Sequence, residues 1–250
     1  MKIALFGYGK MGKIIEKIAL DRRHEIVLKI GRDNQHEATP ENLQRADVAI
    51  EFSTPASAIG NIISCFEAGL PIVVGTTGWY EHLEEIKFQC LESDNTLMYG
   101  TNFSVGVNIF FHVNRMLAKI MNNYPYYDVQ VEEIHHMQKL DSPSGTAITI
   151  AEGILENLEV KGEWKNILVS DTGEVTDDNL KPDQLLIESH RIEHVPGTHT
   201  VLYDSEVDSI EFKHTAHNRN GFALGAVLAA EWLKDKKGFL PVTDMFTFNA

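Results

Sequence analysis

The sequence predicts an α/β protein that has a doubly wound parallel sheet in its first part and a mixed sheet in an α+β second part. Strand-like and helical runs alternate over the first hundred residues. A glycine-rich turn, Gly7–Gly12, joins the first strand to the first helix. After residue 103, several strand-like runs follow with few helices between them, which indicates a mixed or antiparallel sheet. We therefore expect a first domain at 1–103 and a second at 104–213.

Apolar runs and helical spacing define the elements of both parts. In the first part, strands are expected at 2–6, 25–30, 46–52, 71–74 and 96–99, and helices at 13–20, 55–68 and 81–91. In the second, helices are expected at 105–122 and 145–158, and strands at 127–134, 185–192, 199–203 and 207–214. An acidic run at 171–182 is expected to form a surface loop. The last helix, 221–233, could return to either part.

Composition excludes several classes of partner. The chain has 36 acidic and 22 basic side chains, a formal net charge of −14, and a surface this acidic repels nucleic acid and anionic lipid. No apolar run approaches the ~20 residues that span a bilayer. The first apolar run ends in glycines after five residues, which is typical of a strand rather than of a signal peptide. Cys65 and Cys90 lie outside any metal-binding spacing, so we expect reduced thiols, no metal site and a cytoplasmic protein.

The turn Gly7-Tyr8-Gly9-Lys10-Met11-Gly12 matches the pattern GxGxxG, which binds the pyrophosphate of a dinucleotide in Rossmann-type domains. The first glycine permits the turn, the second lets the pyrophosphate approach the backbone, and the third lets helix and strand pack closely. A purely structural turn is the alternative. Because the motif opens a β-α-β unit, we favour dinucleotide binding by these six residues.

The charge after the second strand bears on the choice of cofactor. Dinucleotide-binding domains usually place an acid about 20 residues beyond the glycines to hold the ribose hydroxyls. Here the strand ends in Ile30-Gly31-Arg32-Asp33. Arg32 and Lys10 suit a 2′-phosphate, so we expect NADPH to be accepted at least as well as NADH. A solvated Arg32, with Asp33 reaching the ribose, is the alternative.

Two further loops, Gly75–Gly78 and Gly100–Ser104, follow the fourth and fifth predicted strands. Ligands on doubly wound sheets bind at the carboxyl ends of the strands, where both loops fall. Their small hydroxyl and amide side chains suit the ribose and the nicotinamide amide. Either loop alone would more often be an ordinary turn, but together with the glycine turn they favour a nicotinamide cofactor.

The stretch EIHHMQKLDSPSGT at 133–146 concentrates positive charge in an acidic protein. It brings His135, His136 and Lys139 within five positions, just before a predicted helix. N–H groups at a helix start favour a bound carboxylate, and a histidine can donate a proton. The alternatives are half-exposed histidines before an ordinary helix cap, or a zinc site, which adjacent histidines disfavour. We favour a carboxylate-binding site with a proton donor beside it.

These motifs resemble the dihydrodipicolinate reductase family. The run EIHHMQKLDSPSGTA is similar to that family's signature, in which Glu-x-His-His is followed by Lys-x-Asp-x-Pro-Ser-Gly-Thr. The likeness runs nearly from end to end. It also covers GYGKMG at 7–12, EFST at 51–54, GTTG at 75–78, TNFSVGV at 101–107, and Arg219 with Phe222 before the last helix.

The resemblance implies an NAD(P)H-dependent reductase that converts 4-hydroxy-tetrahydrodipicolinate, a small cyclic dicarboxylate, to tetrahydrodipicolinate in lysine and diaminopimelate biosynthesis. It implies that His135 is the general acid/base, that Lys139 is the proton donor, and that a substrate carboxylate is bound by His136, Gly145 and Thr146. Beyond the glycine turn, the implied cofactor contacts are Gly75, Thr76, Thr77, Gly100, Thr101, Asn102, Phe103, Arg219 and Phe222. It also implies that 104–213 binds substrate and builds a homotetramer, while 214–250 rejoins the dinucleotide-binding domain.

The chain departs from the family's usual pattern in its shorter glycine loop, in the missing acid after the second strand, and in Glu193, where glycine is usual. The preference between NADH and NADPH therefore stays open, and Arg191 is given no role. A semialdehyde dehydrogenase would need a nucleophilic cysteine at the nicotinamide, but both cysteines lie in predicted helices. An amine dehydrogenase, or a nucleotide sensor without turnover, would also fit a two-domain chain with these motifs.

Overall fold

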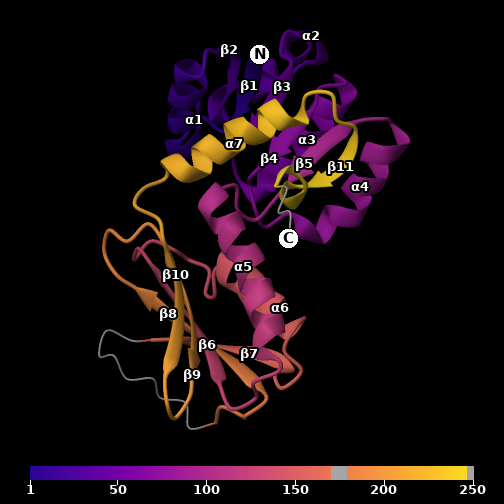
Figure 1. The fold of residues 1–250 in the computed structure, drawn as a ribbon. Coiled ribbons are helices and arrows are strands. Elements are labelled where there is room, and N and C mark those ends of the chain that lie inside the picture. The colour runs from indigo at the N-terminus through magenta and orange to yellow at the C-terminus, as the bar shows by residue number, and fades with distance from the viewer. Residues whose placement is uncertain (170–178, 247–250) are drawn as a thin grey trace. The chain divides into compact units, whose positions relative to one another are not determined.

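A computed structural model describes residues 1–169 and 179–246 (Figure 1). The chain forms two compact units. The first combines Met1–Val105 with the segment from Arg219 onwards, and the second is Gly106–Asn218. Both ends of the chain therefore contribute to the first unit. Most of the loop expected at 171–182 lies outside the described residues.

Within the described residues, the first unit is built on a sheet of six parallel strands in the order β11-β5-β4-β3-β1-β2. The strands are β1 (Lys2–Phe6), β2 (Glu25–Ile30), β3 (Val48–Glu51), β4 (Ile72–Val74), β5 (Thr96–Tyr99) and β11 (Gly238–Pro241). From β1 the chain adds β2 on one side and β3 on the other, so the strand order reverses between β1 and β3. Open α/β sheets bind ligands beside such a reversal, at the carboxyl ends of the strands.

Helices cover both faces of this sheet because alternate residues of its strands point to opposite sides. Ile3 and Leu5 pack in a core with α1 (Lys10–Asp21) and α7 (Asn220–Leu233), which lie side by side in Figure 1. Ala4 and Phe6 pack in a second core on the other face. Its helices are α2 (Pro40–Leu43), α3 (Pro55–Glu67) and α4 (Leu83–Glu92). Short 3₁₀ helices complete the unit at Arg32–Glu37, Tyr80–His82 and Val242–Met245.

The second unit has a mixed sheet of five described strands in the order β10-β9-β6-β8-β7. They are β6 (Asp128–His135), β7 (Glu163–Leu168), β8 (Gln184–Arg191), β9 (Thr198–Asp204) and β10 (Ser209–Thr215). β8 runs parallel to both β6 and β7, whereas β9 is antiparallel to β6 and β10. Two helices, α5 (Val105–Met121) and α6 (Gly145–Leu155), pack on one face. Asn114 of α5 donates to the Ile150 carbonyl of α6 at 3.0 Å, and Phe110 stacks on Phe212 of β10.

The predicted fold class is confirmed, but some elements were missed. The sequence did not predict α2, β7, β11 or the 3₁₀ helix after β2. The missed strands lie at sheet edges, and β11 (GFLP) contains glycine and proline, which are depleted in strands. His135, which directly follows the strand expected at 127–134, is the last residue of β6. No helix among the described residues combines the length and the apolar composition that crossing a bilayer requires.

Candidate active site

The glycine turn after β1 is closely packed at its two ends and open in its middle. Gly7 has φ +87°, and a Cβ there would lie 2.0 Å from the Phe52 carbonyl oxygen. A Cβ on Gly12 would lie 2.2 Å from the Gly7 carbonyl oxygen. By contrast, a Cβ on Gly9 would meet no atom within 4 Å. The first and third glycines are thus required by packing, while Gly9 faces free space that suits a pyrophosphate.

A cavity of about 880 Å³ lies at the carboxyl ends of β1, β2 and β3. Four predicted cofactor contacts line it, namely Gly7, Tyr8, Gly9 and Arg32. Asp33, which the sequence offered as an alternative ribose contact, also lines it. The sequence did not predict the other lining residues, which are Lys29, Ile30, Gly31, Asn34, Gln35, Phe52, Ser53, Thr54 and Ser57. Their place in the chain could have indicated them, because the segments that follow β1 and β3 flank the reversal of strand order. The position and size of the cavity suit a nucleotide.

The remaining predicted cofactor contacts are absent from the described lining of this cavity: Lys10, Met11, Gly12, Gly75, Thr76, Thr77, Gly100, Thr101, Asn102, Phe103, Arg219 and Phe222. Met11 packs against the core shared by α1 and α7. Phe103 is buried, and its carbonyl oxygen would lie 1.7 Å from a Cβ on Gly225 of α7. Arg219 directly precedes α7 as its N-cap. The loop after β5 is therefore held against α7.

One wall of the cavity is held by a small charged cluster. The Tyr8 hydroxyl donates a hydrogen bond to Glu16, and the Lys29 ammonium donates to Glu16 Oε1 at 3.0 Å. Lys29 Nζ also lies 4.8 Å above the centre of the Tyr8 ring. These two hydrogen bonds hold the pKa of the Glu16 carboxyl below its usual range. Lys29 is thereby held in the lining of the cavity that also contains Arg32, which adds a second cation that sequence reasoning missed.

The loops after β3 and β4 are joined through Glu51, which is wholly buried. The Ser53 N–H donates to Glu51 Oε1 at 3.0 Å and to Thr76 Oγ1 at 2.8 Å. Asn61 Nδ2 donates to Ser53 Oγ at 3.1 Å. Burial raises the pKa of Glu51, although hydrogen bonds from Ser53, Thr76 and Asn61 oppose the rise. Glu51 thus positions both loops beside the cavity.

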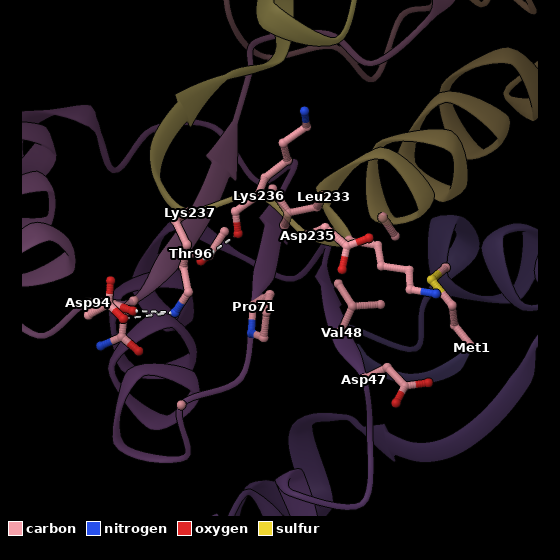
Figure 2. Close-up of a pocket in the computed structure, with 14 residues that line it drawn as sticks. Met1, Asp47, Val48, Pro71, Asp94, Thr96, Leu233, Asp235, Lys236 and Lys237 are labelled. Atoms are coloured by element: carbon pink, nitrogen blue, oxygen red, sulfur yellow. Dashed lines mark hydrogen bonds and ion pairs between the residues drawn. The ribbon is translucent and has the colours of Figure 1, made fainter.

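A second pocket, of about 560 Å³, lies at the opposite edge of the same sheet (Figure 2). Val48, Pro71 and Thr96 line it at the starts of their strands. Its charged side chains have both signs, and Lys237 Nζ donates to Asp94 Oδ2 at 3.0 Å. Since nucleotides bind at the carboxyl ends of such sheets, this pocket is not the cofactor site.

In the second unit, the end of β6 and the start of α6 meet at Glu133, which is wholly buried. The Ser144 N–H donates to Glu133 Oε1 at 3.1 Å, and the Ser189 hydroxyl of β8 donates to the same oxygen at 2.8 Å. Ser144 is also the N-cap of α6, where its Oγ accepts the N–H of Ala147 at 3.1 Å. Glu133 therefore fixes the position at which α6 begins, directly before Gly145 and Thr146.

Two histidines and an arginine complete the surroundings of Glu133. His135 Nδ1 lies 3.3 Å and His199 Nε2 lies 3.7 Å from Glu133 Oε2. Arg191 Nη1 lies 3.6 Å from Oε1. Burial would raise the pKa of Glu133, but the neighbouring His135 and His199 rings and the hydrogen bonds from Ser144 and Ser189 hold it far below its usual range. Burial lowers the pKa of His199 to about 4. The cluster is thus organised around an ionised carboxylate.

Arg191 and Lys139 connect this cluster to the loop before α6. Arg191 Nη2 donates to the Asp141 carbonyl oxygen at 2.6 Å. Lys139 Nζ donates to both carboxylate oxygens of Asp141 at 2.9 Å. Although burial opposes it, the hydrogen bond and charge of Lys139 lower the pKa of Asp141. The predicted proton donor is therefore held by a carboxylate, and Arg191 supports the loop that carries it.

The predicted substrate contacts lie at the edge of this cluster. His136 follows β6, and Gly145 and Thr146 form the first turn of α6; all three are partly exposed. A Cβ on Gly145 would meet no atom within 4 Å, so the start of α6 opens onto free space. N–H groups at a helix start attract carboxylates. The second unit thus brings the five predicted catalytic and substrate residues into one region.

The sequence reasoning did not identify Glu133, Ser189 or His199 as members of this cluster. Glu133 precedes His135 by two positions, so a strand through both would place them on the same face. That spacing was the available signal for Glu133. Glu133, His135 and His199 also place ligand atoms within 4.8 Å of one another, a spacing that a metal ion could use. Here the carboxylate accepts hydrogen bonds from protein donors at both oxygens.

Comparisons with known proteins agree along the whole chain. Residues 1–103 match the family described as dihydrodipicolinate reductase, N-terminus, and residues 106–246 match its C-terminus. The 4-hydroxy-tetrahydrodipicolinate reductase of Christiangramia forsetii is 48% identical over 248 residues, which cover 99% of this chain and 98% of that protein.

Solved structures share the fold. A dipicolinate-bound dihydrodipicolinate reductase from Paenisporosarcina sp. TG-14 superposes with a TM-score of 0.74 at 21% identity, covering 98% of this chain and 99% of that one. An amine dehydrogenase from Mycobacterium smegmatis gives 0.64 at 12% identity, covering 99% and 96%. With family matches across both units and a full-length relative, the chain belongs to the dihydrodipicolinate reductase family and is an oxidoreductase with a pyridine-nucleotide-binding, Rossmann-type domain.

Proposed function

We propose that the chain is an NAD(P)H-dependent 4-hydroxy-tetrahydrodipicolinate reductase that forms tetrahydrodipicolinate for lysine and diaminopimelate biosynthesis. The observation that carries the proposal is the 48% identity, over 99% of the chain, to a protein of that name. The arrangement of both units supports it. One carries a nucleotide-sized cavity beside the glycine turn, and the other carries a cationic region with a proton donor.

The dinucleotide is held by the turn Gly7–Gly12, with its pyrophosphate over Gly9. When bound, the reduced nicotinamide supplies the hydride, and the protein supplies position and charge. The loops Gly75–Thr77 and Gly100–Phe103, with Arg219 and Phe222, are proposed to contact its nicotinamide half. Arg32 and Lys29 line the wall where a 2′-phosphate would lie, which supports NADPH being used at least as well as NADH.

The substrate's carboxylate is bound by His136 and by the N–H groups of Gly145 and Thr146 at the start of α6. His135 acts as the general acid/base, and Lys139 is a proton donor. Both also offset the negative charge that develops as hydride arrives. Asp141 holds the Lys139 ammonium group in place, and Glu133 holds His135 and the N-cap of α6.

A coupled assay with the upstream synthase tests the proposed reaction. The purified chain, supplied with fresh substrate, should cause a loss of absorbance at the nicotinamide band with NADPH and with NADH in turn. Arg32→Ala should weaken NADPH binding more than NADH binding. Cofactor binding without substrate-dependent oxidation would instead favour a nucleotide sensor, and oxidation dependent on an α-amino acid would favour an amine dehydrogenase.

We also propose that the protein is a cytoplasmic homotetramer assembled through the sheet of the second unit. Cys65 and Cys90 are both free and buried, which supports a reducing compartment. The face of the sheet away from α5 and α6 carries partly exposed side chains on its central strands, among them Gln130, Glu132 and His190. Light scattering coupled to size exclusion measures the assembly, and a monomer at micromolar concentration would refute it.

A further inference from the structure

The ring of His135 has one nitrogen turned to a buried carboxylate. Nδ1 lies 3.3 Å from Glu133 Oε2, it is cut off from solvent, and it makes no hydrogen bond of ordinary geometry with any described residue. Glu133 receives hydrogen bonds from the Ser144 N–H and the Ser189 hydroxyl, and an ionised carboxylate can only accept. A lone pair on Nδ1 would face the carboxylate oxygen at 3.3 Å and repel it, so neutral His135 is favoured with its hydrogen on Nδ1. In a neutral imidazole, the other nitrogen then carries a lone pair.

The second nitrogen of His135 faces a glycine. A Cβ built on Gly197, which precedes β9 and has φ +157°, would lie 3.1 Å from His135 Nε2. Among the described residues, Nε2 has no protein hydrogen-bond partner, and unlike Nδ1 it is not sealed from solvent. The side chain of His135 retains 10% of its exposure. Nε2 is thus the atom of this ring that a small molecule can reach.

We propose that Glu133 is a positioning residue that fixes His135 as the tautomer protonated on Nδ1, so that Nε2 is the atom that exchanges protons with the substrate. This inference rests on the acid/base role proposed above for His135. In this proposal Gly197, which has no side chain, leaves space beside Nε2 of His135. The arrangement resembles the general use of a buried carboxylate to orient a catalytic imidazole.

The proton balance follows from the tautomer. To act as the acid, His135 carries hydrogen on both ring nitrogens. The hydroxylated substrate first loses its hydroxyl group and a hydrogen as water, which leaves the conjugated dihydro form. When hydride from the reduced nicotinamide adds to the carbon end of that system, the Nε2–H bond of His135 breaks and its proton passes to the nitrogen end. The cofactor becomes oxidised, the substrate has gained a hydride and a proton, and His135 is left neutral with its hydrogen on Nδ1. Solvent then returns a proton to Nε2.

Nuclear magnetic resonance on the full chain, labelled with ¹⁵N at histidine, tests the tautomer directly. Long-range ¹H–¹⁵N spectra distinguish hydrogen on Nδ1 from hydrogen on Nε2, and His135→Gln identifies the signals of His135 among the eleven histidines. We expect neutral His135 in the wild-type chain to carry its hydrogen on Nδ1. Glu133→Gln should abolish that preference. A wild-type ring with hydrogen on Nε2 would overturn the proposal.

The control is Glu152→Gln, an exposed carboxylate on α6 of the same unit. Glu152→Gln should leave the tautomer and turnover unchanged. Glu133→Gln should lower kcat by roughly 10²- to 10⁴-fold, the range that general acid/base catalysis contributes, while the dissociation constant of NADPH stays the same. Retention of both kcat and tautomer in Glu133→Gln would refute the inference.

Two further variants separate this inference from the proposed function. Gly197→Ala should lower kcat but keep hydrogen on Nδ1, and it gives a result even if Glu133→Gln does not fold. If His135→Gln keeps full turnover while the wild-type ring is protonated on Nδ1, the acid/base role fails and the positioning by Glu133 stands. If His135→Gln is inactive and the wild-type ring is protonated on Nε2, the acid/base role of His135 stands and the positioning by Glu133 fails.

Discussion

Replacing Gly9 by alanine should separate cofactor binding from stability. A Cβ at Gly9 meets no protein atom within 4 Å, so the folded chain has room for it. The same methyl group would occupy the space proposed for the pyrophosphate. In Gly12→Ala, the added Cβ would lie 2.2 Å from the Gly7 carbonyl oxygen, a backbone atom that cannot move freely. Gly12→Ala therefore serves as the matched variant in which packing is damaged.

The size of each effect follows from these distances. Gly9→Ala should change the free energy of unfolding by less than about 1 kcal/mol, which moves the melting temperature by about 2–4 °C at this chain length. Loss of a hydrogen bond to a charged phosphate costs about 1.5–3 kcal/mol, so its affinity for NADPH should fall roughly 10- to 100-fold. Overpacking in Gly12→Ala should cost about 1–3 kcal/mol of stability.

Fluorescence titration with NADPH and thermal melts followed by circular dichroism measure the two quantities. Both variants should bind the dinucleotide weakly, but only Gly12→Ala should melt at a clearly lower temperature. An unchanged dissociation constant in Gly9→Ala would show that the pyrophosphate lies elsewhere. A melting temperature as low as that of Gly12→Ala would show that the space beside Gly9 is not free.

Three other outcomes are expected. Lys139→Ala should lower kcat about 10²- to 10⁴-fold with NADPH affinity unchanged, as steady-state kinetics and titration will show; full turnover would refute its role as a donor. The pKa of His199 is lowered by burial from 6.5 to about 4, so its contribution to stability is complete above pH 6.5 and is lost as the pH falls towards 4. This shift corresponds to about 3 kcal/mol of stability. Thermal melts between pH 6.5 and 4 should show a smaller fall in melting temperature for His199→Gln than for the wild-type chain. The pKa of Glu51 is raised by burial. The stability that Glu51 contributes is therefore complete below the pKa that it has in the unfolded chain, and it is lost as the pH rises through the pKa that it has in the folded chain. Glu51→Gln should remove that loss at higher pH, and an unchanged pH profile would contradict the raised pKa of Glu51.

The fold was predictable where the residues of an element themselves determine its secondary structure. β1, β3, β4 and β5 are mostly apolar because both faces of a parallel sheet are covered by helices, and all four were found. β7 and β11 lie at sheet edges, where pairing with one neighbour decides the conformation. β11 pairs with β5, which ends well over a hundred residues earlier in the chain, and no window of sequence contains that information.

The candidate site was predictable to the extent that its residues are adjacent in sequence. The glycine turn and the run from His135 to Thr146 are local motifs. The partners of Glu133 are not local, because Ser189 is 56 residues away and His199 lies on another strand. Arg191 illustrates the difference: the sequence offered it no role, whereas the structure joins it to Glu133 and to the Asp141 backbone.

The division of the first unit between two chain segments has a consequence for synthesis on the ribosome. Helix α7 supplies Ala223, Ala226, Val227 and Leu233 to the core beneath β1 and β3, and β11 completes the edge of the sheet. A nascent chain that has emerged only to residue 218 lacks both elements, although all of Gly106–Asn218 has by then been translated. The intervening unit can therefore acquire its structure during translation, while the nucleotide-binding unit must wait until residue 241 has left the exit tunnel. Until then the part of its sheet that α7 packs on has no cover, which leaves apolar side chains of β1 and β3 exposed during synthesis.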